Sequence, residues 1–398
     1  MKIHTFLLRL HHLHIGQLIP RAITVFFILA IGTGIVLGVR YYQYQQTTQN
    51  SLSQQLLKTQ KELVALKNVD QYKRNNELQD TIKHIETTYD KAVKAYESLL
   101  DLKTLTDKTA DFDTLFADSL HELSQRNYAT ADAKLNDLNK QISDEQKKLA
   151  ATAAPNVPQN ATPNNTPPGS GYSRQSVTAD TGNFVVDLIA ADMGSTRVVV
   201  DTASDGDCSN NCPALPLGTY VSRSGAYAGI NGTFFCPPEY PTCAGKTGSF
   251  DLLVMNKNKV YFNSSNNVYS TNPAVIFGSG FVRFVGAASG WGRDTSVDGV
   301  ISNFPLLVSG GNIVYGDSSD TKFTNKGTRN FVANKGNTVY IGVMYNANMT
   351  DSAHVLKALG MDNAMNLDEG GSTALMLNGS YLAGPGRNIP NAVLFLHK

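Results

Sequence analysis

The chain has 398 residues, of which 17% are charged, and its formal net charge is +1. A length of this order is typical of two or three domains. A near-neutral charge gives no electrostatic basis for binding nucleic acid. Composition changes sharply along the chain, which indicates separate segments with separate roles.

The N-terminal segment predicts a membrane anchor. Residues 22–39 form an uncharged run of 18 residues, close to the minimum for a helix that spans a bilayer. Residues 1–21, the predicted cytoplasmic tail, include basic residues but no acidic ones, and no basic residue lies between Arg40 and Lys58. This asymmetry predicts a single-pass membrane protein with a cytoplasmic N-terminus and an extracytoplasmic C-terminal domain. A cleaved signal peptide is the alternative, although no A-x-A-like site follows the run.

Residues 40–150 form a predicted helical region, because residues 41–150 contain neither glycine nor proline. Two series of apolar and aromatic residues recur at intervals of mostly four and three, which is typical of packed helical seams. We expect a coiled-coil-like long helix and a helical hairpin, separated by a break near Asn127, that act as a spacer. A partner-binding module and self-association are the alternatives. The first series is Leu78, Ile82, Ile85, Tyr89, Ala92, Tyr96 and Leu99, and the second is Ala131, Leu135, Leu138, Ile142 and Leu149.

Residues 151–173 contain five prolines and no charge, which predicts a linker. Residues 174–398 then alternate short β-rich runs with glycine and asparagine turns. A helix is expected at residues 351–360, followed by a strand at 363–367. The pattern predicts an α+β domain of mostly antiparallel strands with few helices.

The cysteines of this domain are clustered between positions 208 and 243. Three pairings are open, of which Cys208 with Cys212 and Cys236 with Cys243 is the simplest. Zinc is the alternative, but neither C-x3-C nor C-x6-C is a usual zinc spacing. We expect disulfides, because an exported domain favours oxidised cysteines.

The stretch NLDEGGSTALMLNG, residues 366–379, holds the candidate catalytic group. Asp368 and Glu369 follow a predicted strand, and Gly370 and Gly371 let a ligand approach the backbone and turn amides toward an anion. Ser372 and Thr373 add hydroxyl donors. An ordinary acidic turn is the alternative, since glycine-rich turns are common.

Three further residues are candidates for substrate binding. Asn231, in GINGTFF, ends a predicted strand and could bind a sugar hydroxyl. Arg329, in KGTRNFVA, and Arg387, in GPGRNIPNAV, could bind phosphate through their fork of donors. A surface charge is the alternative for each arginine.

Taken in order, GINGTFF, FPLLVSGG, GTRNFVA, AHVLKALGMDNAMNLDEGGSTALML and RNIPNAV resemble the phosphodiester glycosidase family over about residues 180–397. That family includes an enzyme that removes α-N-acetylglucosamine from a phosphodiester. The family usually reads D-G-G-G-S where this chain has DEGGS, so Glu369 replaces a glycine. The resemblance matches the family arginines to Arg329 and Arg387.

The resemblance implies a hydrolase that cleaves the glycosidic bond of a sugar 1-phosphodiester in envelope glycans or glycopolymers. Asp368 would stabilise the anomeric centre or activate water, with Glu369 as a possible partner. Arg329, Arg387 and the Gly370 and Gly371 amides would stabilise charge on the departing phosphate. We expect no cofactor and no metal; bound calcium is the alternative, since oxygen ligands are plentiful here, although no ligand spacing supports it. A glycan-binding module without catalysis and an envelope scaffold are the alternatives.

Overall fold

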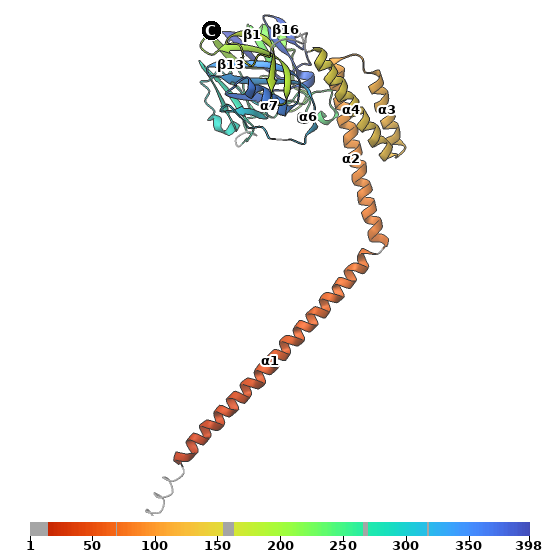
Figure 1. Ribbon diagram of the computed structural model, residues 1–398, viewed down its shortest axis with the longest axis vertical. Helices are drawn as coiled ribbons and strands as arrows, with labels where there is room; N and C mark the ends of the chain where they lie inside the picture. Colours follow the sequence, from red (N-terminus) through yellow and green to blue (C-terminus); the bar gives the residue numbers. More distant parts are fainter. Residues whose placement is uncertain (1–14, 69, 154–162, 266–269, 317) are drawn as a thin grey trace, which may run out of the picture. The chain divides into compact units, whose positions relative to one another are not determined.

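The computed structural model describes residues 15–68, 70–153, 163–265, 270–316 and 318–398. The chain forms two compact units, which divide between His84 and Ile85. Figure 1 colours the elements along the chain: the long helices come first, and the strands fill the C-terminal part.

The first long helix is α1 (Ile15–Lys67). Its apolar part makes it the one helix of the described chain that is long and apolar enough to cross a membrane, and none of that part is buried. The predicted 22–39 run lies inside it. The predicted tail falls mainly on residues 1–14, outside the described residues.

A bundle is formed by the second half of α2 (Asp70–Leu105) with α3 (Ala110–Ser124) and α4 (Tyr128–Ala153). The break predicted near Asn127 is confirmed. The two predicted apolar series meet in one cluster, in which Leu99 and Leu135 are fully buried. The beginning of the first series, with Leu78 and Ile82, is exposed on α2. Only the later residues of the first series therefore pack within the chain.

The linker is shorter at both ends than predicted, because α4 continues to Ala153 and the first strand begins at Gly171. Residues 154–162 lie outside the described residues. The strands are β1 (Gly171–Ala179), β2 (Gly182–Asp192), β3 (Thr196–Thr202), β4 (Ala228–Asn231), β5 (Val254–Met255), β6 (Tyr261–Phe262), β7 (Ala274–Gly278), β8 (Phe281–Val285), β9 (Gly299–Ser302), β10 (Leu306–Ser309), β11 (Asn312–Ile313), β12 (Gly327–Lys335), β13 (Thr338–Ala347), β14 (Asn363–Asn366), β15 (Leu375–Leu377), β16 (Ser380–Ala383) and β17 (Asn391–His397).

These strands form three antiparallel sheets, as the sequence predicted for an α+β domain. The orders are β1-β2-β13-β12-β14-β10-β11, β16-β15-β4-β17-β3 and β6-β5-β9-β7-β8. The described helices of this domain are short: α5 (Leu217–Ser224), α6 (Thr321–Thr324) and α7 (Met349–Ala358), with single turns η1 (Pro241–Cys243), η2 (Ala288–Trp291) and η3 (Gly370–Ser372).

The main core lies where the three sheets meet, and each sheet contributes buried apolar side chains such as Ile341, Phe395 and Val275. Because strand side chains alternate between faces, each sheet has a second apolar face. Helix α7 covers that face of the first sheet and α5 covers that of the second. A capping box of Asn348 and Asp351 starts α7, so Asp351 acts at the third helical position rather than as the cap itself.

Candidate active site

The acidic loop joins the first sheet to the second. Strand β14 lies between β12 and β10, and the chain leaves it through Asp368 and η3 to enter β15. The Asp368 amide donates to the Gly232 carbonyl at the end of β4, 2.8 Å away. Gly370 has φ of 63°, a left-handed conformation that favours glycine. The loop is therefore fixed at the seam between two sheets.

Asp368 is a buried carboxyl, with 7% of its surface exposed. Burial raises its pKa to about 6, because removal from water disfavours the charged form. The charge of Lys322, the Ser372 hydroxyl, the Glu369 amide and the charge of Arg387 oppose this rise. Asp368 can therefore change its protonation state in the neutral to mildly acidic range.

Two asparagines hold the main chain of Asp368. Its carbonyl accepts from Asn231 Nδ2 at 2.7 Å and from Asn330 Nδ2 at 2.6 Å. Asn231 Oδ1 in turn accepts from Asn330 Nδ2 and from the Ala374 amide, each at 3.1 Å. Both asparagines are fully buried. These contacts position the loop, and a direct contact of Asn231 with sugar stays a prediction.

Asn330 is a site residue that was not predicted from the sequence. Its neighbour Arg329 drew attention as a charge, whereas Asn330 has no distinguishing sequence context. Its amide also lies 3.1 Å from the Thr373 hydroxyl, which lies 3.1 Å from that of Thr328. Only the pairing of β12 with β14 brings this amide beside the acidic loop.

Glu369 and Arg329 form a buried ion pair, with side chains 5% and 6% exposed. The Arg329 Nε donates to the Ala347 carbonyl at 3.0 Å, and Nη2 donates to the Lys322 carbonyl at 3.0 Å and to the Asn325 carbonyl. Among the residues that the structure describes, neither Glu369 oxygen has an aligned hydrogen-bond donor. Arg329 thus neutralises Glu369, and the phosphate contact predicted for Arg329 stays untested.

Arg387 also contacts the acidic loop. Its amide donates to the Gly371 carbonyl at 2.7 Å, and its guanidinium lies 5.1 Å from the centre of the Tyr240 ring. Its Nη2 forms an ion pair with Asp101 of α2. Arg387 and Asp368 are close enough to interact electrostatically, so the structure brings together these two predicted site residues.

Lys322 is a second residue that sequence reasoning missed. It is exposed on α6, and its ammonium lies 3.6 Å from the centre of the Phe234 ring. Its charge acts on Asp368 more strongly than that of Arg387 does. A lone lysine in a polar loop carries no sequence signal, so only the fold identifies it. Phe234 also packs edge-on against Phe304.

The cysteines form the two local disulfides, Cys208–Cys212 and Cys236–Cys243. The second closes the loop that carries Tyr240 to the site. In the described part of the chain, no three His, Cys, Asp or Glu residues are grouped so as to hold a metal ion. The expected lack of a metal therefore stays a prediction.

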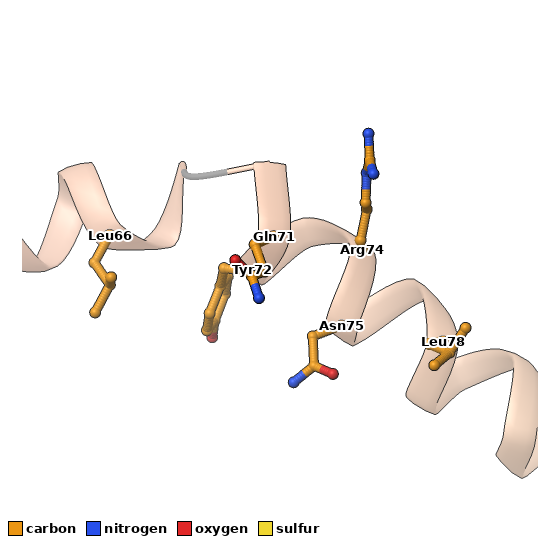
Figure 2. A pocket seen from close by; sticks show the side chains of 6 residues that line it. All are labelled: Leu66, Gln71, Tyr72, Arg74, Asn75 and Leu78. Atoms are coloured by element: carbon orange, nitrogen blue, oxygen red, sulfur yellow. The ribbon is translucent and has the colours of Figure 1, made fainter.

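A separate hollow lies at the junction of α1 and α2, far along the chain from these residues. Figure 2 shows its lining side chains on the two helices, and Arg74 points away from the helix surface while Tyr72 and Asn75 project to the opposite side. The lining residues Leu66, Gln71, Tyr72, Arg74, Asn75 and Leu78 are all exposed. With no buried charge among them, they do not resemble a catalytic site.

Comparisons with solved structures gave distant likenesses. A hypothetical protein from Synechocystis is 13% identical with a TM-score of 0.42, over 57% of this chain and 62% of that one. The catalytic domain of zebrafish N-acetylglucosamine-1-phosphodiester alpha-N-acetylglucosaminidase, auto-inhibited by its pro-peptide, is 17% identical with a TM-score of 0.43, over 59% and 86%. These values assign neither an activity nor residue roles to this chain. A search of curated proteins found no significant match.

The part of the chain that matches a protein family includes the residues of the candidate site. The family described as phosphodiester glycosidase matches residues 224–396, a range that includes Asn231, Arg329, Asp368 and Arg387. It excludes the helices before residue 154. The resemblance read from the sequence motifs is thus confirmed, and residues 224–396 carry the signature of the phosphodiester glycosidases.

Proposed function

We propose that residues 174–398 hydrolyse the glycosidic bond of a sugar 1-phosphodiester of the N-acetylhexosamine 1-phosphate type. The observation that carries the proposal is the buried Asp368 carboxyl beside Lys322, Arg387 and Ser372. A carboxylate next to cations matches the two charges of this reaction, positive at the anomeric carbon and negative on the departing phosphate. The family match supports a hydrolase of this kind.

In the proposed reaction, water adds to the anomeric carbon while the bond from that carbon to the phosphate oxygen breaks. The phosphate monoester departs with the bonding electrons, and the free sugar keeps the hydroxyl of water. A phosphate ester is a weak base, so protonation of the leaving oxygen matters less than in ordinary glycoside hydrolysis. Asp368 as carboxylate stabilises the positive centre or removes the proton from water.

The proposed roles of the other residues follow from their contacts. Lys322 and Arg387 face Asp368 and would hold the phosphate. Arg329 has most of its donors directed to backbone carbonyls, so its role in the proposal is to neutralise Glu369. The Asn231 and Asn330 amides keep the Asp368 main chain in place.

We place the domain outside a membrane, with α1 as a single-pass anchor. The length and composition of α1 and the two disulfides support this placement. The substrates would then be envelope glycans or glycopolymers joined through anomeric phosphates. Protease added to intact cells should remove the C-terminal domain, and a protected domain would contradict the orientation.

The exposed beginning of the helical series supports a second proposal, association between copies of the chain. Leu78, Ile82 and Tyr89 are exposed on α2 at intervals of four and seven, as in a coiled-coil seam. In sedimentation of the full chain in detergent, the Leu78→Ser/Ile82→Ser variant should be smaller than the parent. Equal sizes would remove this proposal.

The activity is tested with the full-length protein in detergent and a synthetic N-acetylglucosamine 1-phosphodiester, chosen for the name of the zebrafish enzyme. Release of free sugar is the readout, and its initial anomeric form, followed by NMR, separates direct inversion from a covalent intermediate. The Asp368→Asn variant is the control. Binding of glycans without turnover of any sugar 1-phosphodiester would favour the binding-module alternative.

A further inference from the structure

Three polar residues of helix α2 lie against the acidic loop and the disulfide-closed loop that carries Tyr240. Glu97, Asp101 and Thr104 are spaced by four and three residues and so share one face of the helix. Glu97 Oε1 accepts from the Thr242 amide at 3.1 Å and also from its hydroxyl. All three residues precede the part of the chain that matches the glycosidase family.

Asp101 is the central residue of this face. Its carboxylate pairs with Arg387 Nη2 and lies beside the Tyr240 hydroxyl. The charge of Lys322 also acts on it. Burial raises the pKa of Asp101, and Arg387 and Tyr240 oppose that rise. One carboxylate thus occupies the point where a guanidinium and a phenol converge, within the electrostatic reach of an ammonium.

The face also fills the space beside the glycines of the acidic loop. A Cβ added at Gly370 would lie 3.9 Å from Asp101 Oδ2. A Cβ added at Gly371 would lie 2.9 Å from Thr104 Oγ1 and would collide with Arg387. Helix α2 therefore occupies the space through which a ligand would approach the two glycines.

The contact of α2 with the loops of the sheet-rich domain is polar, unlike the interior of the helical bundle. The buried apolar cluster around Leu99 and Leu135 shares no residue with the apolar clusters of the sheets. Asp101 keeps 28% of its side chain exposed. Arg387 keeps 8% of its side chain exposed, so solvent reaches the pair from the side of Asp101. A soluble anion can therefore compete for the same donors.

We propose that Arg387, Tyr240 and Lys322 form the subsite for the phosphate of the substrate, and that Asp101 of α2 occupies this subsite as an internal carboxylate competitor. The assignment rests on the proposed function for the identity of the ligand, but the competition itself does not. A phosphodiester carries a negative charge and acceptor oxygens, as a carboxylate does, so both satisfy the same donors. The chain thereby holds its own site closed until a phosphate-bearing ligand displaces α2.

Competition of this kind lowers the apparent affinity by the fraction of molecules in which the subsite is free. If Asp101 fills the subsite in nine of ten molecules, its removal raises the apparent affinity about 10-fold. The gain requires Arg387, because the same guanidinium binds both ligands.

The experiment measures binding of inorganic phosphate to the full-length protein by titration calorimetry. Asp101→Ala should bind phosphate about 10-fold more tightly than the parent. Asp90→Ala is the matched control, since Asp90 is an exposed carboxylate of α2 paired with Lys94 on the same helix. It should bind as the parent does. Asp101→Ala combined with Arg387→Met should lose the gain.

Circular dichroism and thermal unfolding of Asp101→Ala verify that the helices are retained, and Asp101→Asn serves as a second variant if they are not. Phosphate binding equal to the parent in a folded variant would overturn the proposal and leave Asp101–Arg387 as a structural ion pair. Tighter phosphate binding without turnover of any phosphodiester would instead overturn the proposed hydrolysis and leave the anion subsite standing. Tighter binding together with a lower KM supports both.

Discussion

Asp101 and Arg387 form an ion pair across 286 positions of the sequence. The pair joins a helix outside the family match to the loop that precedes the last strand. Arg387 also acts electrostatically on Asp368. Asp368 and helix α2 therefore both interact with one guanidinium.

Replacing Asp368 by Asn should lower kcat by about 100- to 10,000-fold, the usual contribution of a carboxyl that acts on a reacting group. Loss of a transition-state interaction lowers kcat and kcat/KM together. The fold should persist, because the amide has the shape of the carboxyl and removes a buried charge. Steady-state kinetics with a thermal unfolding control tests this. Full activity in the variant would contradict the catalytic role proposed for Asp368.

The rate should depend on the ionisation of Asp368. Its pKa is raised to about 6, so kcat/KM should rise as pH increases through about 6. The linked effect on stability has the opposite direction: the contribution is fully present below about 3.8 and is lost as pH rises through about 6.

The charge of Lys322 lowers the pKa of Asp368, so Lys322→Met should move the acid limb of the pH profile to higher pH. Since Lys322 is exposed, added salt should reduce the difference between the variant and the parent. Lys357→Met, which changes an exposed lysine of α7, is the matched control. An unchanged limb in Lys322→Met would mean that the lysine does not act on Asp368.

The buried Arg329–Glu369 pair should show strong coupling. Arg329→Met or Glu369→Gln alone leaves an uncompensated buried charge, which costs about 3–5 kcal/mol of stability. The double variant should be more stable than the sum of the two losses predicts. Denaturant unfolding of all four proteins gives the coupling, and additive losses would contradict it.

The same four proteins distinguish the roles of Arg329. If it only neutralises Glu369, the double variant should recover activity along with stability. If it contacts phosphate, activity toward the phosphodiester stays low in the double variant, as the sequence resemblance implied. Glu369→Gly restores the family glycine but leaves Arg329 without its partner, so it should lose stability unless Arg329 is also replaced.

Asn330 should act through the position of Asp368. Asn330→Ala removes a donor from the Asp368 carbonyl and should cost about 1–3 kcal/mol and lower kcat. Asn330→Asp places a negative charge there and should shift the acid limb to higher pH. Asn334→Ala on the same strand, whose amide bonds the Gly336 carbonyl, is the control. A normal pH profile in Asn330→Asp would limit Asn330 to a structural role.

Local rules predicted the sheet-rich character of the C-terminal domain. Short apolar runs separated by asparagine or glycine turns are typical of hairpins such as those of β5 with β6 and of β12 with β13, because both signals act between near neighbours. The local disulfides also follow short separations. The seam of α2 was predicted in register, but its exposed beginning was not, since periodicity does not state what covers a face.

The sequence by itself determined the apolar N-terminal helix, the helical region, the sheet-rich domain and the acidic loop with its glycines, because each is encoded in residues close together. Only the tertiary structure decided that Asn330 and Lys322 meet around Asp368, and that Asp101 reaches Arg387 and Tyr240. These contacts arise where strands and helices distant in sequence pack side by side. Their free energy comes from burial and charge pairing between segments, which no local pattern records.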